Sequence, residues 1–192
     1  MIFLGCDGGS TKTEWLLVDH TGQVLAHRIF PGCNFAFWGE DGSRDLMVRS
    51  VQTLLADSGI TSQQITSAML SLTVYGEVPG TEEFFPQVMQ SILPDCPLQF
   101  SNDSVAGWCG SLAGRPGINI VAGTGSVAYG QDSAGNASRV GGWSLFFADE
   151  GSCSWVARQM ITEFVKQADG RHPRSAIYEE LRQELSITHD LY

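Results

Sequence analysis

Short apolar segments bounded by glycine and polar residues open the chain. Three of them span residues 2–6, 14–19 and 23–30. Each has the length of a β-strand and ends in a turn-forming sequence. The turns are too short to hold a crossover helix, so the pattern predicts an antiparallel meander of three strands.

Helical and strand patterns then alternate. The expected elements are, in order, helix 41–58, strand 68–72, helix 81–93, strand 98–101 and helix 103–112. Gly59 is suited to end the first of these helices, because glycine readily adopts the left-handed conformation of a C-terminal cap. Thr81 is the expected N-cap of the second helix.

A second stretch, beginning near residue 117, repeats the opening order. It predicts strands 118–122, 127–131 and 138–142, followed by helices 151–167 and 175–185. In both stretches a turn of Gly, Ser and Thr follows the first strand, at residues 8–11 and 123–126. This is an internal repeat of architecture, and it predicts two domains, 1–114 and 115–192.

Composition narrows the classes of partner. The 192 residues are 43% hydrophobic and 17% charged, with 11 basic and 21 acidic side chains and a net charge of -10. That balance disfavours nucleic acid or an anionic membrane as partner, but not a small phosphorylated ligand held by backbone N–H groups. Five cysteines without a CxxC pair, and no apolar run near membrane-spanning length, indicate free thiols and a cytoplasmic location.

The first glycine turn, residues 7–13, is a candidate phosphate loop. Its candidate ligands are Gly9, Ser10, Thr11 and Lys12. Glycine lets the backbone approach a ligand, and successive N–H groups can bind an anion. Asp7, at the end of the first strand, is placed to hold Mg²⁺ through water. An ordinary hairpin turn explains the same residues about as well.

The second glycine turn carries Thr124 and Gly125 after a second apolar strand. Alone it is also consistent with a tight hairpin. Two such turns at equivalent points of a repeat are more specific, because two loops can bind one polyphosphate from both sides. Nucleotide binding, with ATP as the candidate, is therefore favoured.

Two further segments carry chemistry suited to a sugar. Asp103 follows a strand and could act as a general base, although residues 102–104 could equally cap a helix. Gly142, Trp143 and Asp149 could form a sugar platform, with the ring stacking and the carboxylate accepting from hydroxyls; acidic residues before a helix are the simpler alternative. Three aromatic residues after Asn34 could be a loop anchor or a ligand wall: Phe35, Phe37 and Trp38.

Five segments in this order resemble the BadF/BadG/BcrA/BcrD ATPase family and, within it, the N-acetylglucosamine kinases of the sugar kinase/Hsp70/actin superfamily. The segments are DGGSTKTE (7–14), GCN (32–34), SNDSVAG (101–107), IVAGTGS (120–126) and GGWSLFFADEGS (141–152). The resemblance implies an α/β chain of RNase-H-like (actin-like ATPase) domains that binds ATP and Mg²⁺. It further implies a kinase that phosphorylates the 6-hydroxyl of N-acetylglucosamine.

The resemblance also implies roles for individual residues. Thr11 would lie at the nucleotide, Thr124 and Gly125 near phosphate, and Asp103 would be the catalytic aspartate. The implied sugar contacts are Asn34, Asp103, Ser126, Gly142, Trp143 and Asp149. Cys109 and Cys153 lack the cysteine pattern of the iron–sulfur activators of the family.

The second domain is expected to be truncated, because the sequence ends before the further strands and adenine contacts of an RNase-H-like domain. The chain is therefore expected to be a kinase fragment. The alternatives are a non-catalytic sugar-binding module, or an ATPase activator or sensor. Glucosamine and N-acetylmuramic acid stay open as acceptors. A homodimer is possible, and an open sheet edge favours self-association.

Overall fold

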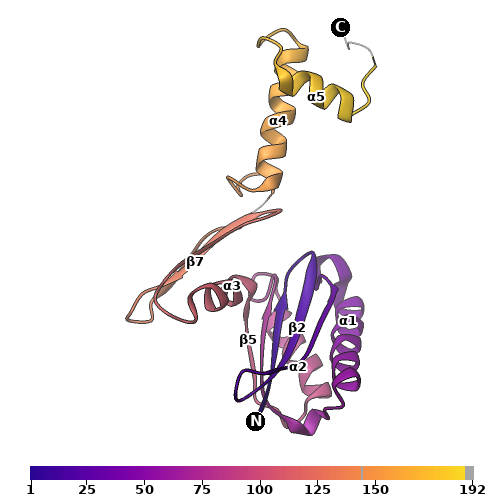
Figure 1. Ribbon diagram of the computed structural model, residues 1–192, viewed down its shortest axis with the longest axis vertical. Helices are drawn as coiled ribbons and strands as arrows, with labels where there is room; N and C mark the ends of the chain where they lie inside the picture. The colour runs from indigo at the N-terminus through magenta and orange to yellow at the C-terminus, as the bar shows by residue number, and fades with distance from the viewer. Residues whose placement is uncertain (144, 189–192) are drawn as a thin grey trace. The chain divides into compact units, whose positions relative to one another are not determined.

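The structure, a computed structural model, describes residues 1–143 and 145–188. Its backbone divides into two units, Met1–Arg115 and Pro116–Tyr192 (Figure 1). Each unit has a sheet of its own, with strand order β3-β2-β1-β4-β5 in the first and β6-β7-β8 in the second. Among the residues that the structure describes, none of the helices combines the length and apolar character needed to cross a bilayer.

The sheet of the first unit begins with the predicted meander. Its strands are β1 (Ile2–Gly8), β2 (Lys12–Asp19), β3 (Val24–Pro31), β4 (Ile65–Leu72) and β5 (Leu98–Asn102). β2 runs antiparallel to both β1 and β3, which confirms the meander. β4 pairs parallel to β1, and β5 pairs parallel to β4. The carboxyl ends of β1, β3, β4 and β5 therefore meet at one edge of the sheet.

Helices cover both faces of this sheet. They are α1 (Phe35–Ser58), the short 3-10 helix η1 (Ser62–Gln64), α2 (Thr81–Ile92) and α3 (Asp103–Leu112). Because side chains alternate along a strand, Leu4 and Leu17 pack with α1 and α2 in the core, whereas Gly5 and Leu16 line a cavity with α3. Figure 1 shows α1 and α3 on opposite sides of the sheet.

Two helix starts differ from the predictions. α1 begins at Phe35, not at residue 41, because Asn34 caps an extra first turn by accepting from the Ala36 amide at 3.0 Å. That turn is set off by Gly39, which has a φ of 65°. The N-cap of α2 is Gly80, so the prediction of Thr81 as the cap is wrong. Thr81 is buried within the helix and donates to the Val78 carbonyl at 2.7 Å.

The second unit repeats the meander. Its elements are β6 (Gly117–Ala122), β7 (Ser126–Gln131), β8 (Ala137–Gly141), α4 (Cys153–Ala168) and α5 (Ala176–Glu184). β7 runs antiparallel to both of its neighbours. Ser152 caps α4 by accepting from the Trp155 amide at 3.1 Å. The order β6-β7-β8 thus corresponds to β1-β2-β3 of the first unit.

Little apolar surface is buried in the second unit. The rings of Phe164 and Tyr178 stack with centroids 5.1 Å apart and join α4 to α5. On the sheet, Ile118, Ile120 and Val140 are exposed. Within the described residues β6 pairs only with β7, whereas β1 pairs on both sides. Apolar side chains and a free strand edge are therefore exposed.

Candidate functional site

The candidate residues of the first unit gather at one edge of its sheet. Cα pairing aligns Gly8, at the end of β1, with Leu72 at the end of β4, and Leu72 with Asn102 at the end of β5. The loops that leave these ends include residues 9–11, 32–34 and 73. Ligands of α/β proteins commonly bind at the carboxyl ends of parallel strands, so this edge is the candidate site of the unit.

The first glycine loop is held tightly in place. The Gly9 amide donates to the Lys12 carbonyl at 2.9 Å, and the Cys33 amide donates to the Gly9 carbonyl at 3.1 Å. A Cβ on Gly32 would lie 2.0 Å from the Ser10 carbonyl oxygen, so only glycine fits there. The Ser10 Oγ lies 3.3 Å from Thr73 Oγ1. Ser10 and Thr11 stay exposed at the tip of this fixed loop.

Lys12 lies apart from the exposed tip of the loop. Its Nζ donates to Glu14 Oε2 at 2.8 Å, and that ion pair raises the pKa of Lys12. Glu14 also bonds His27, with 2.8 Å between Oε1 and Nε2. The structure therefore joins Lys12 to an exposed side-chain network on β2 and β3, and its proposed contact with phosphate needs a different rotamer.

Asn34 has a structural role as well as a candidate ligand role. Its Oδ1 caps α1, and its Nδ2 lies 3.4 Å from Ser10 Oγ as a donor. The structure therefore brings Asn34 directly to the first glycine loop. The sequence separated the two by more than twenty residues.

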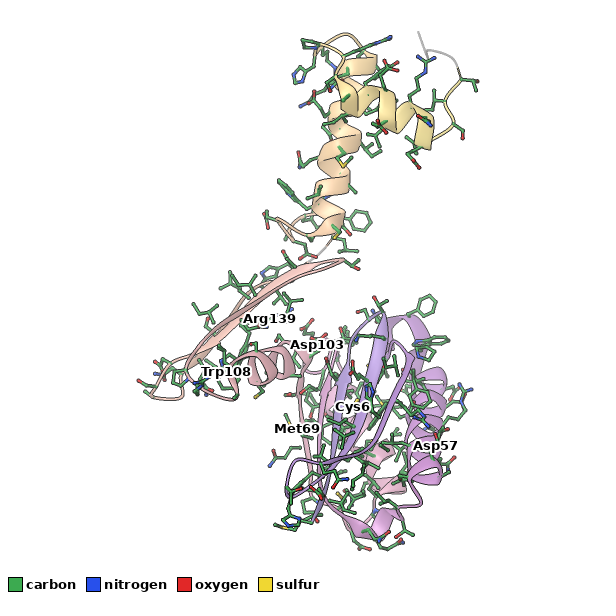
Figure 2. All side chains as sticks on the ribbon, in the orientation of Figure 1. Cys6, Asp57, Met69, Asp103, Trp108 and Arg139 are labelled. Atoms are coloured by element: carbon green, nitrogen blue, oxygen red, sulfur yellow. The ribbon has the colours of Figure 1, made fainter. Side chains whose placement is uncertain are left out.

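Asp103 is the first residue of α3 (Figure 2). Asn102 caps this helix, since its Oδ1 accepts from the Ser104 amide at 3.2 Å and from the Ser104 hydroxyl at 2.8 Å. The expectation that a residue of 102–104 caps the helix is thereby confirmed, with Asn102 as the cap and Asp103 as the first helical residue. The positive end of the helix dipole stabilises a carboxylate at this position. Asp103 also lies close enough to Cys33 for its charge to act on that thiol.

The cysteines at this edge are not suited to nucleophilic chemistry. Burial raises the pKa of the Cys33 thiol to about 11, although a hydrogen bond from Thr13 opposes the shift. Burial also raises the pKa of Cys6, with a further contribution from Cys33. Both thiols are therefore protonated near neutral pH, and nucleophilic attack needs the thiolate.

Asp7 lines a cavity between the sheet and α3 together with Glu14 and Ser71. Desolvation, and then the negative charge of Glu14, raise the pKa of Asp7. The Asp7 carboxylate provides the hard oxygen donors that Mg²⁺ prefers and fits a water-mediated ion, whereas both Glu14 oxygens are already bonded to Lys12 and His27. Within residues 1–143 and 145–188 no group of three or more His, Cys, Asp or Glu side chains could hold a metal by itself.

The second glycine loop connects β6 to β7 and contacts the start of α4. The Cys153 amide donates to the Gly123 carbonyl at 2.8 Å, and the Ser126 hydroxyl donates to the Glu150 carbonyl at 2.9 Å. A Cβ on Gly125 would lie 2.7 Å from Asp149 Oδ2. The loop of residues 123–126 and the segment that precedes α4 are thus packed together.

Asp149 is 5% exposed, and its φ of 61° is uncommon for a residue other than glycine. Its Oδ1 is buried, with no hydrogen-bond partner among the described residues. A buried carboxylate oxygen normally has a donor. A ligand hydroxyl would supply one, which agrees with the sugar contact expected of this residue.

The remaining predicted sugar residues lie at the end of β8. Gly141 and Gly142 both have positive φ, at 81° and 69°, and a Cβ on Gly142 would lie 2.6 Å from an Arg139 nitrogen. The Arg139 guanidinium donates to the Gly142 carbonyl at 3.2 Å. Trp143 is 86% exposed, and the structure does not pack it against a neighbouring core. Ser144, within the predicted motif, lies outside the described residues.

Two contributors were missed in the sequence. Thr73 contacts Ser10 and donates its amide to the Gly8 carbonyl. Arg158 of α4 donates to the carbonyls of Phe146 and Ala148, the second at 3.2 Å, and so holds the segment that leads to Asp149. No local pattern marks either residue, because both act through contacts made only in the folded chain.

Sequence comparison relates the chain to one protein family and to two proteins named as sugar kinases. The profile of the BadF/BadG/BcrA/BcrD ATPase family matches residues 4–188. An N-acetyl-D-glucosamine kinase of Dictyostelium discoideum is 26% identical over 97% of this chain and 61% of its own length. An N-acetylmuramic acid/N-acetylglucosamine kinase of Clostridium acetobutylicum is 24% identical over 96% of the chain and 60% of its own length.

A solved structure supports the fold. A Chromobacterium violaceum protein, provisionally assigned as an N-acetylglucosamine kinase, superposes with a TM-score of 0.72 at 22% identity, over 95% of this chain and 63% of its own. The chain is thus a mixed α/β protein whose structural neighbours have the actin-like ATPase fold, and it spans about three-fifths of the length of these relatives. With a profile match over nearly all of its residues, the chain belongs to the BadF/BadG/BcrA/BcrD ATPase family.

Proposed function

We propose that this chain is part of an ATP-dependent amino-sugar kinase, which transfers the γ-phosphoryl group of ATP to the 6-hydroxyl of N-acetylglucosamine. One observation carries the proposal. A fixed glycine loop, an amide side chain and a carboxylate, contributed by Ser10, Asn34 and Asp103, gather at the carboxyl edge of one sheet. Two relatives of the chain are named as kinases of amino sugars.

The first glycine loop is the proposed phosphate site of the first unit. Gly9 provides the close backbone approach, and the hydroxyls of Ser10 and Thr11 are exposed donors. Lys12 would add positive charge near the phosphates if its side chain rotated away from Glu14. Asn34 would donate to a sugar hydroxyl with the side-chain amide that now reaches Ser10.

Asp103 is the proposed general base. It accepts the proton of the acceptor hydroxyl while that oxygen forms its bond to the γ-phosphorus and the bond from phosphorus to the ADP oxygen breaks. Most of the catalysis then comes from positioning and electrostatics. Mg²⁺, which Asp7 would hold through water, supplies charge neutralisation at the phosphates.

The second unit is proposed to be a partial RNase-H-like domain with the second phosphate loop. Thr124 and Gly125 would contact phosphate, and Ser126 would contact the sugar. The buried, unpartnered Oδ1 of Asp149 is the strongest support for a hydroxyl ligand in this unit. Gly142 offers backbone groups and Trp143 an exposed ring to the same sugar.

Calorimetry tests the function directly. We expect the chain to bind N-acetylglucosamine, and to bind it more tightly with a non-hydrolysable analogue of Mg·ATP present. Glucosamine and N-acetylmuramic acid, titrated in the same way, decide between the acceptors. A homodimer stays a proposal that sedimentation of the same sample tests.

The result also separates the alternatives. Sugar binding that does not depend on the nucleotide would favour a non-catalytic binding module. ATP hydrolysis at a rate that does not depend on the sugar would favour an activator or sensor. No binding of any of the three sugars would contradict the kinase proposal.

A further inference from the structure

Two aromatic side chains form a wall beside the first glycine loop. Phe37 and Trp38 lie in the first turn of α1, and their rings meet edge to face with centroids 5.1 Å apart. Phe37 is 78% exposed and Trp38 44%. Large rings at the surface are ordinary when they stand alone, but these two border a cavity that also contains candidate ligand groups.

The wall is fixed before any ligand arrives. Trp38 Nε1 donates to the Gly32 carbonyl at 2.8 Å, and a Cβ on Gly42 would lie only 3.1 Å from Trp38 Cβ. On the inner side of the same turn, the ring of Phe35 packs 5.1 Å from that of Phe84 and joins the core. Phe35 is therefore the anchor, and Phe37 and Trp38 form a preorganised surface, which lowers the entropic cost of binding.

The cavity has a volume of about 360 Å³ and contains no charged side chain. Its lining residues are Ser10, Thr11, Pro31, Gly32, Asn34, Phe37 and Trp38. The volume lies at the small end of the range for ligand sites. Hydroxyl and amide groups together with aromatic rings suit a neutral group that is partly polar and partly apolar, such as a carboxamide with a methyl group.

Resting on the proposed function, we propose that the wall of Phe37 and Trp38 recognises the acyl group of an N-acylated hexosamine. The acyl methyl would lie on the rings, and the acyl oxygen would accept a hydrogen bond from the Asn34 side-chain amide. These residues would then set the preference for N-acylated sugars over sugars with a bare 2-hydroxyl. A carboxylate substituent would meet no cation among the lining side chains.

The test is the ratio of two affinities. Titration calorimetry of the 192-residue chain compares N-acetylglucosamine with glucose, the latter by competition, in the unaltered protein and in Phe37→Ala. Burial of one methyl group changes an affinity by about fourfold. We therefore expect Phe37→Ala to lower the affinity for N-acetylglucosamine by about four- to tenfold. The affinity for glucose should change by less than about twofold, because glucose has no acyl group to contact the Phe37 ring.

Two further variants sharpen the comparison. Phe37→Tyr keeps the ring and should bind both sugars as the unaltered chain does. Val24→Ala shortens another exposed apolar side chain, at the far end of β3, and should change neither affinity. Since Phe37 is so exposed, its replacement should leave the thermal unfolding of the chain unchanged.

Each remaining outcome contradicts a stated claim. If Phe37→Ala lowers the affinity for both sugars equally, or for neither, the acyl assignment is wrong while the kinase proposal stands. If the unaltered chain binds neither sugar, the kinase proposal fails and the acyl assignment fails with it.

Discussion

Under the proposed kinase function, replacing Asp103 with asparagine is expected to lower phosphoryl transfer to N-acetylglucosamine by about 10²- to 10⁴-fold, the usual contribution of a general base. Asparagine keeps the size of the side chain but cannot accept the proton. The affinity for the sugar should change far less, because amide and carboxylate both accept a hydrogen bond. Initial rates of ADP release in the presence of the sugar, together with calorimetry, separate the two effects.

The Asp103→Asn substitution is not expected to disturb the start of α3. Asn102 caps α3, so the substitution removes no cap. Asp95→Asn, at an exposed aspartate outside the candidate site, is the matched control and should retain full transfer. Transfer by Asp103→Asn within a few-fold of the unaltered rate would show that another group takes the proton.

Replacing Gly32 with alanine is expected to destabilise the first unit by about 3 kcal/mol or more, which is the upper end of the cost of overpacking. The added methyl carbon would lie 2.0 Å from the Ser10 carbonyl oxygen and 2.8 Å from the Thr11 nitrogen. Both are backbone atoms, so no side-chain rotation relieves the clash. Thermal unfolding should shift down by about 10 °C or more for a unit of this size.

Gly110→Ala is the control for that substitution. Gly110 lies within α3, and a Cβ there would meet nothing within 4 Å. Because alanine favours helix more than glycine does, this variant should be at least as stable as the unaltered chain. Unchanged stability of Gly32→Ala would mean that the glycine loop is not held against Gly32 as described.

Regular elements were predicted well where a local pattern defined them. The meander of the first unit follows from apolar runs closed by turns, and Gly59, with a φ of 68°, ends α1 as expected. The first turn of α1 was not predicted, because Gly39 breaks the helical spacing there. That turn carries Phe37 and Trp38, which the sequence singled out but left open between a loop anchor and a ligand wall.

The environment of Lys12 was open to prediction and was nevertheless missed. The sequence placed the second strand at 14–19, whereas β2 begins at Lys12. Residues two apart on a strand share a face. An earlier strand start would therefore have placed Lys12 beside Glu14, as the structure does. Contacts over long separations, such as Ser10 with Thr73, leave no comparable signal in the chain.

The central proposal is that each of the two glycine loops binds nucleotide phosphate. Titration of a non-hydrolysable ATP analogue with Mg²⁺ into the unaltered chain, Thr11→Val and Thr124→Val tests it most directly, with Thr53→Val on the exposed side of α1 as control. We expect one nucleotide per chain, and about tenfold or greater loss of affinity in each loop variant, since a hydrogen bond to a charged group is removed. Full affinity in either loop variant would contradict the account.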